Sequence, residues 1–261
     1  MKRLAPACIA ALFLLFPSAS LRTQEPGPAH APDFRAPQFI APLYFPPKPN
    51  APFMAIAKTT WVRTLPDKST VTTQNERVVA RDMDGRIFQE RRSFVPVPDP
   101  GNQVSRVAAT EYDDPVEHTK YICHPIAKSC DLYGYHAPVT DAVTAAGLQP
   151  DKFSYVTREN LGTDTFAGLE VERSRETTTH YVQTIGNTGA ILRTVEYWYS
   201  PDLGVNVQVK RHDPRDGDQT LWLTDVSLTA AAPETFKVPA EYRIIDHRGT
   251  RQAPSEPAAE R

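Results

Sequence analysis

The chain is poor in cysteine, in glycine and in any surplus of charge. Its 261 residues include 3 cysteines and 12 glycines, and 29 lysines and arginines stand against 31 aspartates and glutamates. A formal net charge of −2 leaves no overall basic field for a nucleic acid. The composition also excludes an acidic or weakly hydrophobic disordered chain, because 40% of the residues are hydrophobic and 23% are charged.

The motifs of several common active sites are also absent. The chain has no Gly-x-Ser-x-Gly, no His-Glu-x-x-His, no phosphate-binding glycine loop and no dinucleotide-binding fingerprint. Aspartate-rich segments at 82–85 and 213–218 lack the distal glutamate of a calcium loop and are interpreted as hairpin turns. Glu170, Glu172, Glu176 and His180 fit a solvated strand face better than acid–base catalysis. We assign no catalytic residue, metal ligand or cofactor, and a hydrolase is the least favoured class.

The longest apolar run lies close to the first residue. Lys2 and Arg3 precede the apolar segment 7–16, and Ser18, Ala19 and Ser20 offer small residues for cleavage. This run is too short to span about 30 Å of hydrocarbon. We therefore expect residues 1–20 to be a secretory signal peptide. The mature protein should be soluble, exported to the periplasm or the extracellular space, and without a transmembrane segment.

Two cysteines remain in the expected mature chain, Cys123 and Cys130. Apolar and aromatic residues flank a central turn that contains a proline, which is typical of a hairpin. Opposed residues of antiparallel strands are about 4.5–5.5 Å apart, within reach of a disulfide. A disulfide is therefore the favoured interpretation. Two free thiols and a metal site with His118, His124 and His136 stay open, although the C-x6-C spacing does not match a zinc knuckle.

Proline is abundant in the chain, in contrast to cysteine and glycine. Nine of the 25 prolines lie between Pro26 and Pro52. Because proline lacks an N–H donor, such a run cannot enter a helix interior or a central strand. We expect residues 21–52 to form an extended arm or linker with polyproline character. The arm is interpreted either as a spacer or as a docking segment for a partner.

Strand patterns fill residues 53–247. Threonine- and valine-rich runs at 53–65 and 70–81 flank a turn, and Asp84-Gly85 marks the next hairpin. The alternation of Leu203, Val205, Val207 and Val209 with small or polar residues indicates a half-buried antiparallel strand. About ten strands are expected, with one or two short helices, of which 138–158 is the best candidate. Residues 248–261 are expected to be a polar, disordered tail.

Aromatic residues fall on both faces of the expected strands 190–200 and 219–228. A sheet with two partly apolar faces must cover both with a helix, a second sheet or a bound apolar ligand. Ordinary core packing is one interpretation of these residues. The other is a ligand cavity, whose tentative lining is Trp61, Tyr197, Trp198, Tyr199 and Trp222.

A series of strands and turns occupies residues 195–242. It contains VEYWYSPDLG, a valine-rich strand, KRHDPRDGDQT, LWLTDV and ETFKVPAEY. This series resembles the C-terminal half of the LolA/LolB/RseB-like envelope proteins. With the strand 161–177 and the WYSPDL turn, it resembles even more a group of exported bacterial proteins of acidobacterial type. These motifs are structural turns, and no lipid-contacting residue carries over individually.

The resemblance implies a strongly curved antiparallel sheet, because LolA-like proteins hold lipid or acyl chains in a half-barrel or sense the state of envelope proteins. We therefore expect a mainly β protein with a LolA-like half-barrel. Its favoured function is non-enzymatic binding of an apolar or lipid-type ligand, or of a lipidated partner, in the cell envelope. The alternative is an envelope or surface protein-interaction module that docks through its proline-rich arm.

Overall fold

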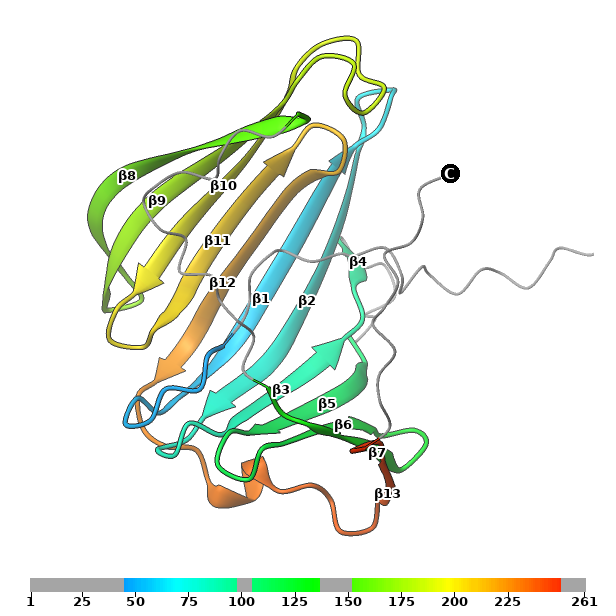
Figure 1. The fold of residues 1–261 in the computed structure, drawn as a ribbon, viewed down its shortest axis with the longest axis vertical. Coiled ribbons are helices and arrows are strands. Elements are labelled where there is room, and N and C mark those ends of the chain that lie inside the picture. The colour runs from blue at the N-terminus through cyan, green and yellow to red at the C-terminus, as the bar shows by residue number, and fades with distance from the viewer. Residues whose placement is uncertain (1–44, 98–104, 137–151, 250–261) are drawn as a thin grey trace, which may run out of the picture. The chain divides into compact units, whose positions relative to one another are not determined.

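One sheet of thirteen strands contains most of the chain that the computed structural model describes, which is residues 45–97, 105–136 and 152–249 (Figure 1). A single 3₁₀ helix, η1 (Pro233–Phe236), follows the twelfth strand. The strands are β1 (Phe53–Thr64), β2 (Thr70–Arg81), β3 (Ile87–Arg92), β4 (Val95–Val97), β5 (Val107–Asp114), β6 (Thr119–His124), β7 (Ser129–Gly134), β8 (Ser154–Phe166), β9 (Leu169–His180), β10 (Ile191–Ser200), β11 (Val205–Asp213), β12 (Gly217–Ser227) and β13 (Arg243–Asp246).

The sheet is open, with β13 and β8 at its two edges. Its order is β13-β7-β6-β5-β3-β2-β1-β12-β11-β10-β9-β8, and β4 pairs with β2. Neighbouring strands are antiparallel, except that β13 runs parallel to β7. Figure 1 shows that the sheet is strongly curved along this order. The expectation of a mainly β, curved antiparallel half-barrel is therefore confirmed.

The core follows the alternation of side chains along the central strands. Successive side chains of a strand point to opposite faces, so every second residue in the first half of β1 is buried. The expected alternation in β11 is also confirmed, since its valines are buried. The largest apolar cluster consists of Phe45, Phe53, Ala55, Ala57, Val79, Ile87, Leu169, Val171, Trp198, Leu203, Val205, Val207 and Leu223.

The helix expected at 138–158 is wrong over the part that the structure describes. Residues 154–158 belong to strand β8, where Ser154 is opposite His180 and Val156 is opposite Thr178. Pairing with the neighbouring β9 and the strand propensity of Tyr155, Val156 and Thr157 override the weak helix signal. Residues 138–151 lie outside the described residues, as do the expected signal peptide, most of the arm and residues 250–261 of the tail.

The last residues of the expected arm pack against the sheet. Phe45 is 3% exposed, and its ring centroid lies 5.8 Å from that of Phe53. The Nζ of Lys48 donates hydrogen bonds to the carbonyls of Pro201 and Asp202, at 2.7 and 2.8 Å. Residues 45–52 therefore pack against the β unit and are not part of an extended linker.

Arg81 is the main attachment of this segment. Its side chain is completely buried and donates to the carbonyls of Ala51, Pro46 and Leu203 at distances of 2.5–2.9 Å. Burial lowers the pKa of Arg81 to about 10. All of these acceptors are neutral carbonyls, and charge-assisted hydrogen bonds of this kind are stronger than neutral ones.

Candidate functional site

A pocket of about 370 Å³ lies between one end of the sheet and the segment that follows η1. Its volume falls within the range of small-molecule sites. We call it the C-terminal pocket. Its aromatic and aliphatic walls are Ile87, Tyr112, Tyr121, Phe236 and Val238, and its polar lining is Arg86, Asp113, Asp114, Thr119 and Lys237.

The sheet side of the pocket is built by aromatic pairs across neighbouring strands. Tyr112 of β5 is opposite Tyr121 of β6 and opposite Phe88 of β3. The rings of Phe88 and Tyr112 are 5.3 Å apart and tilted by 54°. Burial raises the pKa of the Tyr112 hydroxyl, so this side chain stays neutral at physiological pH. These rings give the pocket a rigid apolar floor.

The chain after η1 covers this floor. The backbone N–H of Lys237 donates to the carbonyl of Glu234, and the N–H of Tyr242 donates to that of Pro239, both at 3.1 Å. These two turns fix the segment that carries Val238 and Phe236. Val238 and Tyr242 pack against the cluster of Tyr112 and the two cysteines.

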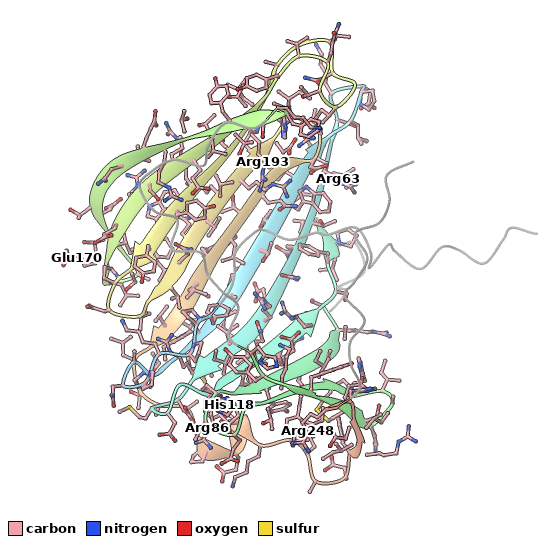
Figure 2. The ribbon with its side chains drawn as sticks, viewed as in Figure 1. Arg63, Arg86, His118, Glu170, Arg193 and Arg248 are labelled. Atoms are coloured by element: carbon pink, nitrogen blue, oxygen red, sulfur yellow. A yellow bond between two sulfur atoms is a disulfide. The ribbon has the colours of Figure 1, made fainter. Side chains whose placement is uncertain are left out.

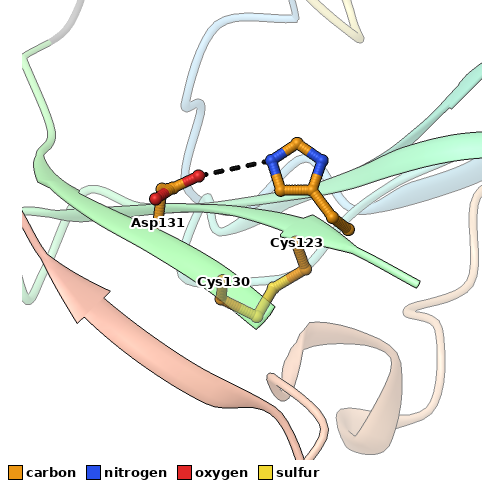
Figure 3. Close-up of a disulfide and its surroundings, with 4 residues drawn as sticks. Cys123, Cys130 and Asp131 are labelled. Carbon is orange, nitrogen blue, oxygen red and sulfur yellow. Dashed lines mark hydrogen bonds and ion pairs between the residues drawn. A yellow bond between two sulfur atoms is a disulfide. The ribbon is translucent and has the colours of Figure 1, made fainter. Parts of the chain in front are cut away.

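The segment that covers the pocket continues into β13, which is paired with β7. Strand β13 pairs with β7, and the N–H of His247 donates to the carbonyl of Leu132 at 2.8 Å. Beside it, Cys123 and Cys130 face each other in register and form a disulfide (Figure 3). The disulfide expected from the sequence is therefore confirmed, and the two open alternatives, free thiols and a metal site, are not what this structure shows.

The carboxylate of Asp131 contacts two histidines. Its carboxylate lies 2.8 Å from Nε2 of His247 and 3.3 Å from Nε2 of His124. The hydrogen bond from His247 is the main cause that holds the pKa of Asp131 below its ordinary value. The ring of His247 also stacks on Tyr133, with centroids 4.9 Å apart. Within the described ranges, no group of three or more His, Cys, Asp or Glu could hold a metal ion.

A line of mostly buried polar side chains crosses the sheet on the face opposite to Tyr112 and Tyr121. Nζ of Lys120 lies 3.0 Å from Asp113 and 3.3 Å from Glu111. The amide of Gln89 donates to Glu111 at 2.8 Å and accepts from Arg77 at 3.0 Å. We call these five residues the polar ladder. Its outer end, Asp113, also lines the pocket.

The ladder contains charges of both signs in a poorly solvated place. Burial is the main reason that the pKa of Asp113 is raised. Burial acts in the same direction on Glu111, but the hydrogen bonds and charges of Arg91 and Lys120 bring the pKa of Glu111 below its ordinary value. Burial, with the charge of Arg91, lowers the pKa of Arg77 to about 10. Because side chains alternate along a strand, the ladder lies on the opposite face of the sheet from Tyr112 and Tyr121, and it supports the strands behind the pocket.

The pocket is lined by acidic, basic, aromatic and aliphatic side chains. Its ten lining residues contain no histidine, cysteine or serine. The carboxylates considered earlier lie elsewhere: Glu170 and Glu172 are exposed, and Glu176 pairs with Arg158. The arrangement can bind and orient a molecule with an apolar body and a polar end.

The structure divides the tentative cavity residues between the two faces of the sheet. Tyr197 is opposite Val209, which is opposite Leu221, so these three side chains share a face. Trp61 lies on that same face, because it is opposite Gln219, two residues from Leu221. Tyr199, two residues from Tyr197 on β10, is 39% exposed.

Trp222 lies on the other face, since it is opposite Gln208, whereas Trp198 stands at the irregularity of the β10–β11 pairing and packs in the largest apolar cluster. The Trp198 ring lies between two cations, with Cζ of Arg173 at 4.9 Å and Nζ of Lys210 at 5.1 Å from its centroid. None of the five expected residues lines the C-terminal pocket. Their assignment as ligand contacts stays a prediction.

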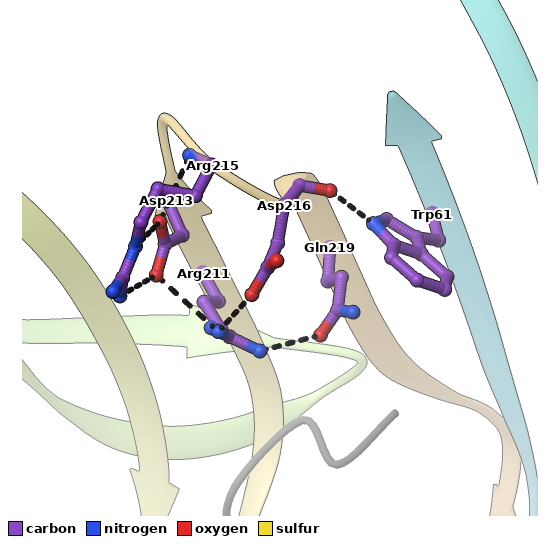
Figure 4. A network of polar contacts seen from close by, with 6 residues as sticks. All are labelled: Trp61, Arg211, Asp213, Arg215, Asp216 and Gln219. Carbon is purple, nitrogen blue, oxygen red and sulfur yellow. Dashed lines mark hydrogen bonds and ion pairs between the residues drawn. The ribbon is translucent and has the colours of Figure 1, made fainter. Parts of the chain in front are cut away.

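Trp61 belongs to a polar network at the β11–β12 turn (Figure 4). Its indole N–H donates to the carbonyl of Asp216 at 2.7 Å. The fully buried Asp213 accepts from the guanidinium of Arg215 at 2.8 Å, and Arg211 reaches Asp216 at 2.9 Å. The hydrogen bond from Arg215 is the main cause that holds the pKa of Asp213 well below its usual range. This tryptophan therefore fixes a turn.

The residues of the C-terminal pocket were not selected from the sequence. The signal that could have found them is the Phe236–Pro239 segment, a turn motif with two apolar side chains and no strand of its own. Tyr112 and Tyr121 are further signals, because they are aromatic residues on neighbouring strands of one hairpin.

No family model matches the chain, and no curated protein matches it. Solved structures match it at low identity. An uncharacterised conserved protein from Thermus thermophilus shares 9% identity over 76% of this chain and 91% of its own, with a TM-score of 0.36. The Pseudomonas aeruginosa MucA/MucB complex matches with 14% identity over 74% of this chain and 58% of the matched chain, with a TM-score of 0.35. The Mycobacterium tuberculosis lipoprotein LppX shares 12% identity over 69% of this chain and 88% of its own, with a TM-score of 0.26.

This chain covers less than two thirds of the full length of the chain that it matches in the MucA/MucB complex. Since these TM-scores are low, the fold is established by the strand order and register of this chain itself, and any functional proposal rests on its own residues.

Proposed function

We propose that this chain is an exported, non-enzymatic binding protein of the cell envelope, which holds an apolar or lipid-type molecule, or the acyl chain of a lipidated partner, in the C-terminal pocket. The observation that carries this proposal is the pocket itself, in which aromatic and aliphatic walls meet a polar lining. An aromatic floor binds an apolar body, and a few placed polar groups orient its other end.

The charges around the pocket favour an amphiphile over a strongly charged ligand. Arg86 and Lys237 bring basic side chains to the lining, and Asp114 brings an acidic one. Arg86 is moreover paired with Asp82, at 2.6 Å. With no surplus of either sign, the pocket fits an apolar chain that ends in a small polar or zwitterionic group.

The proposal is tested by filling the pocket. Val238→Trp places a larger side chain in the wall, while Val116→Trp makes the same change at a residue that is 62% exposed and outside the pocket. Binding of a fatty acid that carries a fluorophore should weaken on the order of tenfold in the first variant and stay unchanged in the second. Thermal unfolding of both variants checks that they are folded.

Mass spectrometry of gently purified protein is the companion measurement. A co-purifying lipid in the wild type, lost in Val238→Trp, supports the proposal. Absence of any co-purifying lipid, together with no binding of the fluorescent fatty acid, overturns it. Equal binding by the two variants would overturn the assignment of the C-terminal pocket.

A second function is favoured by the attachment of the arm. Because Arg81 and Lys48 fix residues 45–51 to the sheet, a partner bound by residues 21–44 would be held close to the β unit. This is the interaction-module alternative. Deleting residues 21–44, which spares the buried Phe45, should abolish pull-down of an envelope protein and leave thermal unfolding unchanged. Retained pull-down would contradict this alternative.

A further inference from the structure

Five exposed apolar side chains gather at the end of the sheet where the β9–β10 loop lies. Each is between 37% and 51% exposed. They come from the loop itself, from the start of β10 and from the residue before β8. We call them the apolar tip: Phe153, Tyr181, Val182, Ile185 and Leu192. Figure 1 shows this loop at the opposite end of the sheet from η1, and so from the C-terminal pocket.

Hydrogen bonds join the segments of the tip and order its loop. The N–H of Tyr181 donates to the carbonyl of Phe153 at 3.0 Å. Asn187 organises the loop, because its amide donates to the carbonyl of Tyr181 at 2.8 Å and its Oδ1 accepts from the N–H of Ile185 at 3.1 Å. The N–H of Gln183 donates to the carbonyl of Asn187 at 2.8 Å. The loop thus satisfies polar groups internally and leaves its apolar side chains exposed.

Basic side chains accompany the apolar residues of the tip. Between Glu176 and Glu196 the chain has no acidic residue, but it carries Arg193. Nζ of Lys152 lies 4.7 Å from the centroid of the Phe153 ring. Figure 2 places Arg193 and Arg63 at this same end of the sheet. Such a combination of apolar and cationic side chains is typical of a surface that meets anionic lipids.

The acidic residues of the neighbouring turns are already engaged. Asp216 lies 2.9 Å from Arg211, and Asp218 lies 2.6 Å from Nδ1 of His212. Asp67, in the β1–β2 turn, accepts hydrogen bonds from the hydroxyl and the N–H of Ser69. Asp216 is thus paired with a cation, and hydrogen bonds engage the other two carboxylates, while Lys152, Arg193 and Arg63 are the basic groups at this end of the sheet.

We infer that the apolar tip docks the protein on a bilayer surface that contains anionic lipid. Val182, Ile185 and Leu192 enter the boundary between head groups and acyl chains, Tyr181 lies at that boundary, and Lys152 meets the lipid phosphates. Within the described residues no helix has the length and apolar content that a bilayer crossing requires. The docking is proposed as peripheral, and it is independent of any ligand in the C-terminal pocket.

The test is co-sedimentation of the full chain with vesicles of phosphatidylcholine alone and with phosphatidylglycerol added. The wild type should bind the anionic vesicles and release as salt is raised, because salt screens exposed charges. Val182→Asp with Ile185→Asp should lower the affinity on the order of tenfold or more. Val116→Asp with Ile126→Asp is the matched control, since it changes the same residue types at exposed positions of other turns.

A second measurement follows insertion directly. In Ile185→Trp, anionic vesicles should shift the tryptophan emission to the blue, and in Ile126→Trp they should not. No sedimentation of the wild type with anionic vesicles, or an equal loss in the tip and control variants, would overturn the inference. So would a monomer–dimer change in the tip variant with unchanged vesicle binding, because the tip would then be a contact between copies.

Discussion

The guanidinium of Arg81 donates a 2.5 Å hydrogen bond to the carbonyl of Leu203, which lies 122 residues further along the chain. The same group donates to Ala51 and Pro46. One buried side chain therefore joins the end of the arm, strand β2 and the turn between β10 and β11. Because the three acceptors are neutral and distant in sequence, the arginine holds these segments in register.

Replacing Arg81 with methionine should lower the free energy of unfolding by about 3 kcal/mol or more, because several buried carbonyls lose their donor at once. Chemical denaturation with a linear extrapolation measures this change. Arg106→Met, at an exposed arginine, should change the free energy by less than about 0.5 kcal/mol. Similar values for the two variants would show that the Arg81 contacts do not stabilise the fold.

Gly217 and Gly168 both have a positive φ, so comparing their alanine variants distinguishes backbone strain from steric clash. Gly217 has φ +90°, and a Cβ there would clash with the carbonyl of Val62 and lie 3.0 Å from Cα of Arg63. Gly168 has φ +80° with no atom near an added Cβ. Gly168→Ala should cost about 1–2 kcal/mol, and Gly217→Ala should cost clearly more, since it adds a clash to the strain. Thermal unfolding of the two variants measures this difference. Equal melting temperatures for Gly168→Ala and Gly217→Ala would contradict the predicted clash.

Asp213 should contribute to the acid sensitivity of the protein. Its pKa in the folded state is depressed, chiefly by the hydrogen bond from Arg215. A depressed pKa stabilises the fold above the unfolded value of about 3.9, and this contribution is lost as pH falls through the folded value. The free energy of unfolding should therefore fall below about pH 4 more steeply in the wild type than in Asp213→Asn. Parallel pH curves for the two proteins would contradict this role.

Removing the disulfide should destabilise the region that carries the C-terminal pocket. Cys123→Ala with Cys130→Ala should lower the free energy of unfolding by about 2–3 kcal/mol, as the chain-entropy account of a short loop gives. Since Val238 and Tyr242 pack on this cluster, binding of the fluorescent fatty acid should weaken as well. Unchanged stability and unchanged binding would show that the disulfide does not support the pocket.

Much of the fold follows from local sequence signals. The alternation of Val205, Val207 and Val209 identifies β11, and Asp84-Gly85 identifies a turn in which Gly85 has φ +85°. The helix expected at 138–158 is wrong at residues 154–158, because pairing with β9 determines the conformation there. Arg81 could not be identified as buried, since its acceptors come from backbone distant in sequence.

Residues of the C-terminal pocket carry local signals, but their assembly into one site could not be predicted, again because it depends on contacts distant in sequence. It exists because β13 pairs parallel to β7 and brings Phe236 and Val238 over Tyr112 and Tyr121. Parallel pairing across about a hundred residues leaves no local pattern in the sequence. Periodicity could suggest aromatic residues such as Trp198 and Trp222, but it could not show that Trp198, at an irregularity of the β10–β11 pairing, joins the largest apolar cluster while Trp222 lies across the sheet from Tyr197.

The most direct test of the central claim is photo-crosslinking with a fatty acid that carries a diazirine at its apolar end, followed by mass spectrometry of the peptides. We predict that the label is found on peptides that contain Tyr112, Tyr121 or Phe236, and that Val238→Trp removes it while Val116→Trp does not. Labelling confined to the peptides of Trp61 and Tyr197, or labelling that is unchanged in Val238→Trp, would contradict ligand binding in the C-terminal pocket.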